Sequence, residues 1–145
     1  MKEAARRRAT YVIVPDDPLA EVAARWRAMW EEPAGTAGAA GFEQSAADAL
    51  AAWRASRFEL PDYYLVMAPA LNGGTGADLY LGPLRAARPR RVAVAGTAGS
   101  PGQAAGLLAA LRSLEHGPWW PPLDDLVDAS RHFYAADLAA TPPPR

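Results

Sequence analysis

The chain has 145 residues, about the commonest size for one domain, and hydrophobic residues make up 50% of it. Its formal net charge of −1 gives no general attraction to nucleic acid or to an anionic membrane, so neither is an expected partner. The absence of cysteine excludes disulfides, iron–sulfur clusters and thiol nucleophiles. No apolar stretch approaches the roughly 20 residues of a membrane span, and residues 1–9 lack the apolar core of a signal peptide. We therefore expect a cytoplasmic protein.

A buried strand is predicted at residues 10–14, where β-branched and aromatic side chains precede a turn at 15–18. Asp17 is suited to cap the helix that follows, and Pro18 suits its first position. The apolar residues of the next segment share one helical face and predict a helix over 18–31. They are Leu19, Val22, Ala23, Trp26, Met29 and Trp30.

A second helix is predicted after a loop that is rich in glycine and alanine, residues 33–41. Ser45 and Asp48 have the spacing of a capping box, although the helix could begin slightly earlier. The apolar spacing up to Trp53 indicates a helix that ends near Phe58. Trp26, Trp30 and Trp53 all fall on helical core stripes, where we expect them to pack.

Residues 63–68 predict a second strand, and a glycine-rich turn at 69–76 follows it. Two structures remain open for residues 77–88. They could form a helix kinked by Gly82 and Pro83, or 78–81 could be a strand that pairs with the preceding one through the turn. We favour the helix.

The last third of the chain predicts a third strand at 92–95 and a helix that begins at Ser100 and ends before Gly117. The apolar stripe of this helix consists of Leu107, Leu108, Leu111 and Leu114. An extended connector at 119–122 leads to a last helix.

The predicted order is β-α-α-β-α-β-α-α, which indicates an α/β fold. We expect a small, mostly parallel sheet of about three strands, flanked by four or five helices. A single domain should span residues 1–138, and 139–145 should be a flexible proline-rich tail.

A ligand site is predicted at the carboxyl ends of the strands, where open parallel sheets bind ligands and where three loops should meet. Glycine-rich turns before helices expose N–H groups that can hold a small phosphate- or carboxylate-bearing ligand. The candidate ligand-binding residues are Asp16, Asp17, Asn72, Gly73, Gly74, Thr75, Gly96, Thr97, Gly99 and Ser100. The glycine spacing at 96–102 is not that of the dinucleotide fingerprint, and the P-loop pattern is absent because it needs a lysine and Lys2 is the only one.

Other reactive patterns are weaker. Asp124 and Asp128 share a helical face and could bridge a cation, although acidic residues in a first helical turn also complement the helix dipole. His116 stands at a predicted helix end, and His132 follows Asp128 by one turn, where a carboxylate could orient it as a base. We predict no metal or cofactor and assign no catalytic residue; whether the protein is an enzyme stays open.

Trp119 and Trp120 are adjacent in an extended segment, so their side chains should point in opposite directions. One is expected in the core and the other at an interface, where exposed tryptophan is often a hot spot. The favoured interpretation is a non-catalytic binding or assembly module, a homo-oligomer or a subunit of a larger protein complex. The alternative is a small α/β enzyme or sensor that binds an anionic ligand at the strand ends.

Overall fold

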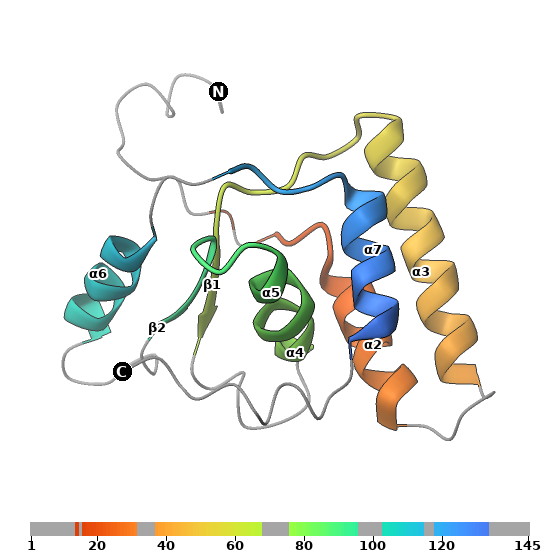
Figure 1. The fold of residues 1–145 in the computed structure, drawn as a ribbon, viewed down its shortest axis with the longest axis horizontal. Helices are drawn as coiled ribbons and strands as arrows, with labels where there is room; N and C mark the ends of the chain where they lie inside the picture. The colour runs from red at the N-terminus through yellow and green to blue at the C-terminus, as the bar shows by residue number, and fades with distance from the viewer. Residues whose placement is uncertain are drawn as a thin grey trace.

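The computed structural model describes residues 14, 16–31, 37–67, 76–95, 103–114 and 118–133 (Figure 1). Within these ranges the fold is mixed α/β and mostly helical. Its elements are α2 (Ala20–Glu31), α3 (Ala37–Arg54), β1 (Tyr64–Met67), α4 (Ala77–Leu79), η2 (Tyr80–Leu84), α5 (Arg85–Ala87), β2 (Val92–Ala95), α6 (Gln103–Ser113) and α7 (Leu123–His132). Because α4, η2 and α5 are continuous, the described residues form five helices, and their order agrees with the predicted one.

The described sheet has two parallel strands, β1 and β2, in a register that pairs Tyr64 with Val92 and Met67 with Ala95. This confirms the predicted strands at 63–68 and 92–95 and their parallel direction. The predicted strand at 10–14 lies outside the described residues except for Val14, which is exposed and in no strand.

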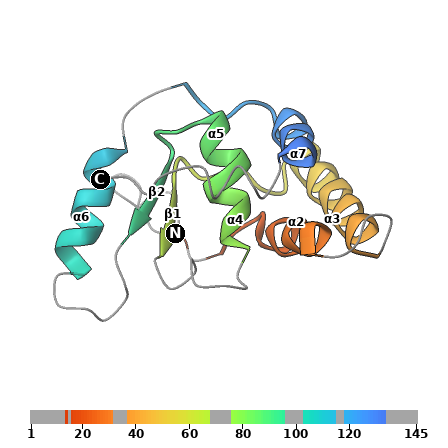
Figure 2. The same cartoon turned by 60° about the horizontal axis from the view of Figure 1, so that its bottom comes forward.

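The elements form layers (Figure 2). α6 covers one face of the sheet, the α4–η2–α5 helix covers the other, and α2, α3 and α7 lie beyond that helix. The alternation of β1 fits this arrangement, because Tyr64 and Val66 belong to the main core while Leu65 and Met67 pack with Ala93 and Ala95 on the α6 side.

α2 begins as predicted. The Leu19 N–H donates to Asp17 Oδ1 at 2.9 Å, which confirms Asp17 as the cap. α3 starts at Ala37, so the prediction of a loop up to residue 41 and of a cap at Ser45 was wrong; it ends at Arg54, before the predicted end near Phe58. Gly38 is buried in α3, and a Cβ on Gly41 would lie 3.4 Å from Arg25 Cδ. α3 packs against α2 and buries Gly38 and Phe42 near its start, and this tertiary packing overrides the low helix propensity of the glycines.

Residues 77–87 are helical, so of the two structures left open for this segment the helix is the one that forms. Pro83 has no N–H to donate within a helix, and the chain accommodates it in the wider π turn of η2. The Arg85 N–H then donates to the Tyr80 carbonyl, and the helix continues as α5.

The main core lies between the sheet and the helices α2, α3, α7 and α4–η2–α5. Its largest fully buried side chains are Trp26, Phe42, Leu79, Leu84, Leu123 and Leu126. A second, smaller cluster, which we call the α6 cluster, has Ala93, Ala95 and Ala110 as its buried members among the described residues; Leu65, Met67, Leu107 and Leu114 pack partly buried against it.

Leu108 was wrongly predicted to be in the core of α6, since its side chain is 53% exposed. Neighbouring residues on a helix point about 100° apart, and the narrow contact of α6 with β2 accommodates Leu107 but not Leu108. Among the helices of the described residues, none is long and apolar enough to cross a membrane.

Candidate functional site

Asp17, a predicted ligand-binding residue, accepts hydrogen bonds from other residues of the chain. Its Oδ1 accepts the Leu19 N–H and lies 3.4 Å from the Tyr64 hydroxyl, and its Oδ2 accepts the hydroxyl of Tyr80. The Tyr64 and Tyr80 rings pack with their centroids 4.9 Å apart. This cluster connects the start of α2 to β1 and η2.

The two tyrosines of this cluster are neutral hydrogen-bond donors at physiological pH. Burial raises the pKa of both hydroxyls well above the usual value of 10, and the negative charge of Asp17 raises it further. Neither phenol can therefore act as a base or a nucleophile near neutral pH. The arrangement fits a structural connection, and the predicted role of Asp17 in ligand binding stays a prediction.

Asp16, the other acidic candidate in this turn, is exposed and forms no hydrogen bond or ion pair with the described residues. Within the described ranges, no three histidine or acidic side chains come together in a way that could hold a metal ion.

The candidates Asn72, Gly73, Gly74, Thr75, Gly96, Thr97, Gly99 and Ser100 lie outside the described residues, so the predicted anion site stays a prediction. The strand register does bear on it. Because Met67 and Ala95 are paired in the parallel sheet, the carboxyl ends of β1 and β2 lie at the same end of the sheet.

Gly76, which ends the first of these loops, has a structural reason to be glycine. Its φ is 71°, and a Cβ there would lie 2.9 Å from the Ala23 carbonyl carbon. A side chain would thus be strained and would collide with α2. The backbone conformation and the contact with Ala23 explain why this position is a glycine, and no ligand is needed to explain it.

Two acidic residues of α7 form ion pairs with arginines. Asp124 pairs with Arg54 of α3 at 3.0 Å, and Asp128 pairs with Arg131. His132 is exposed, and its Nδ1 lies 2.9 Å from the backbone carbonyl of Asp128, so the carboxylate does not orient the ring as we expected. His116 lies outside the described residues.

Trp119 and Trp120 point in opposite directions, as predicted. Trp120 is 5% exposed, donates from Nε1 to the Pro61 carbonyl at 2.8 Å and packs edge-on against Tyr64. Trp119 is 52% exposed.

The exposed Trp119 is held in place by arginines. The guanidinium carbon of Arg91 lies 4.7 Å from the Trp119 ring centroid and 5.3 Å from that of Tyr63. Arg88 Nε donates to the Trp119 carbonyl at 2.6 Å. Arg91, only 6% exposed, donates from Nε to the Pro118 carbonyl and from a terminal nitrogen to that of Asp62, both at 2.8 Å. Ring and backbone of Trp119 are thus both fixed.

We call Tyr63, Arg91 and Trp119 the amino-end cluster, because Tyr63 and Arg91 directly precede β1 and β2. It therefore lies at the opposite end of the sheet from the predicted ligand site. The sequence analysis missed the roles of Tyr63 and Arg91, and the only signal was an arginine and a tyrosine placed just before apolar strands.

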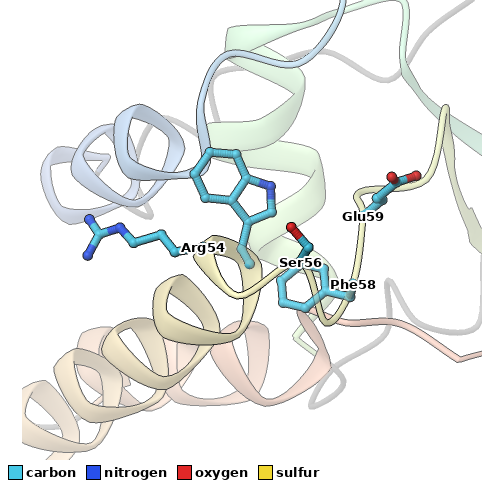
Figure 3. Close-up of a pocket in the computed structure, with 5 residues that line it drawn as sticks. Arg54, Ser56, Phe58 and Glu59 are labelled. Atoms are coloured by element: carbon cyan, nitrogen blue, oxygen red, sulfur yellow. The ribbon is translucent and has the colours of Figure 1, made fainter.

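A further surface feature lies where α3 ends, in an open hollow of about 330 Å³ lined by Trp53, Arg54, Ser56, Phe58 and Glu59 (Figure 3). The Ser56 N–H donates to the Trp53 carbonyl and the Arg57 N–H to that of Ala52, while Ser56 has a φ of 54°. These are the bonds of a Schellman turn, in which glycine is the usual residue.

Comparison of the chain with protein-family models, with curated proteins and with solved structures found no match.

Proposed function

We propose that the protein is a non-catalytic binding and assembly module, and that Trp119 is the centre of its contact with a partner. The supporting observation is a half-exposed indole whose ring rests on Arg91 and whose carbonyl is bound by Arg88. A large aromatic side chain that is already fixed loses little conformational entropy on binding, so more of its burial appears as affinity.

The chemistry of the described polar groups supports this proposal. Asp17 binds the hydroxyls of Tyr64 and Tyr80, and Asp124 and Asp128 pair with arginines. Such groups stabilise the fold and are not poised for acid–base work.

The favoured partner is a second copy of the chain. A two-stranded sheet has two outer edges, and in the described part of the chain neither edge is paired with a strand. The predicted strand at 10–14 could cover only one of them. An open edge readily pairs with a strand of another molecule, which favours self-assembly.

Native mass spectrometry of the purified protein, over a range of concentrations, tests the proposal. We expect a dimer or larger species, and we expect Trp119→Ala to weaken the assembly by at least about tenfold, as for an interface hot spot. Leu108→Ala is the matched control, because Leu108 is an equally exposed apolar side chain on α6 and should change nothing. A wild-type protein that stays monomeric at high micromolar concentration would refute self-assembly, and equal assembly of both variants would refute the role of Trp119.

A second candidate is a small α/β enzyme or sensor that binds a phosphate- or carboxylate-bearing ligand. The observation that favours it is the register of the parallel strands, which places Met67 and Ala95, the carboxyl ends of β1 and β2, at the same end of the sheet. Calorimetric titration with inorganic phosphate tests this function. Binding that is lost in Gly99→Asp supports it, and the absence of binding in the wild type argues against it.

A further inference from the structure

We propose that the hollow at the end of α3 is a binding site for an organic ammonium cation, such as a trimethylammonium group or a methylated lysine side chain. Its binding residues are Trp53, Phe58 and Glu59. The inference goes beyond the proposed assembly through Trp119, because it concerns a different side-chain set and a different class of ligand.

The first argument comes from the two aromatic walls. Trp53 and Phe58 are half-buried and pack against the main core, while both also line the hollow. Core packing holds the rings in place, and the surface that faces the hollow stays accessible. The electron-rich face of an aromatic ring attracts a cation within about 6 Å, and tryptophan attracts it most strongly.

The second argument is electrostatic. Glu59 is exposed and forms no ion pair or hydrogen bond with any described residue, so its negative charge is available to a ligand. The hollow also adjoins the carboxyl end of α3, a helix of 18 residues, where the helix dipole is negative. Both effects favour a positive ligand over a negative one.

Arg54 does not cancel this preference. Its guanidinium pairs with Asp124 at 3.0 Å. Figure 3 shows the Arg54 side chain extending away from Ser56, Phe58 and Glu59. The positive charge that lines the hollow is thus balanced by α7, and the carboxylate of Glu59 is the lining charge that has no described partner.

The shape of the site is preformed and matches a headgroup better than a whole molecule. The Schellman turn at Ser56 fixes the chain between Trp53 and Phe58 through two backbone hydrogen bonds. The volume of about 330 Å³ is near the lower limit for a small-molecule site, about 300 Å³. Because the hollow is open, the rest of the ligand can extend into solvent, as it would from a lipid-like headgroup or a peptide side chain.

The experiment follows the indole N–H signals of the protein by NMR during titration with choline and, separately, with a peptide that contains trimethyllysine. The signal of Trp53 is identified by its loss in Trp53→Phe. We expect it to shift saturably with both cations and to stay in place with 3,3-dimethylbutanol, which has the shape of choline without its charge. Much tighter binding of the peptide would identify the ligand as a methylated lysine of another protein. Equal or tighter binding of choline would identify it as a free or lipid-borne headgroup.

Variants of Glu59 test the charge without disturbing the core. Glu59→Gln should weaken binding roughly threefold to fivefold, as expected for an exposed ionic contact, and Glu59→Lys should abolish it. Glu21→Gln, another exposed glutamate, is the control and should leave binding unchanged. The proposal is overturned if the Trp53 signal does not move, if the neutral analogue binds equally well, or if Glu59→Lys still binds. Trp119→Ala should not alter the titration, so the two proposals can fail separately.

Discussion

Replacing Asp17 by alanine should destabilise the protein by about 2–4 kcal/mol. The cap that Asp17 gives to α2 through the Leu19 N–H contributes about 1 kcal/mol. The Tyr80 hydroxyl would lose its charged acceptor, and a part-buried hydroxyl without a partner costs about 1–3 kcal/mol. Tyr64, at 3.4 Å from the carboxylate, adds less. The sum is a large part of the roughly 5–15 kcal/mol by which domains are stable.

Urea unfolding, followed by circular dichroism, measures this loss. Asp16→Ala is the matched control, because the neighbouring carboxylate is exposed and has no described partner; it should change the free energy of unfolding by less than about 0.5 kcal/mol. Asp17→Asn keeps a capping side chain and an acceptor, so it should cost only about 1 kcal/mol.

A double-mutant cycle of Asp17→Ala with Tyr80→Phe isolates the hydrogen bond between these side chains. The two single changes should be less than additive, with a coupling free energy of about 1 kcal/mol or more. If Asp17→Ala were as harmless as Asp16→Ala, or if the two changes added fully, the reasoning that Asp17 connects three elements would be wrong.

Three other predictions concern stability. The raised pKa of Tyr64 and Tyr80 means that the unfolded chain releases protons first. The contribution of these tyrosines to stability is therefore constant below about pH 10 and falls above it, by up to about 1.4 kcal/mol per pH unit for each tyrosine. Absorbance at 295 nm should show both phenols ionising only as the protein unfolds; ionisation of all tyrosines in the folded protein would contradict this. Gly76→Ala should lower the free energy of unfolding, measured with urea, by about 2 kcal/mol or more, because it combines a positive φ with a contact to Ala23; a neutral effect would exclude the close approach. Ser56→Gly should raise stability by about 0.5–1 kcal/mol in the same assay by relieving its left-handed backbone, and a loss would show that the serine is not strained.

Elements with a local signal were predictable from the sequence. The strand at 92–95 and the helix at 18–31 follow from short apolar runs, the 3.6-residue period and the cap at Asp17, which depend on neighbours along the chain. The early start of α3 was not predictable in this way, because the packing of α3 against α2, which buries Gly38 and Phe42, outweighs the loop-like composition.

The candidate site was less predictable because its contacts join distant residues. Asp17 could be identified as a cap, but its acceptance of a hydrogen bond from Tyr80, 63 residues away, has no sequence signal. The opposite orientation of the adjacent tryptophans follows from strand geometry, whereas the contact of Arg91 with Trp119 does not. Likewise, the match of Asp124 to a metal-binding pattern gives no hint of its pairing with Arg54.

The unequal size of the two apolar clusters has a consequence for how the protein opens. Among the described residues, α6 is attached through a cluster whose buried members are three alanines, which bury little apolar surface, whereas the other described helices contribute to the main core. Detaching α6 should therefore cost much less free energy than global unfolding, and its amides should exchange with deuterium through a local opening that denaturant hardly accelerates. In that open state the α6-facing side of the sheet, with Leu65 and Met67, becomes exposed while the rest of the fold persists.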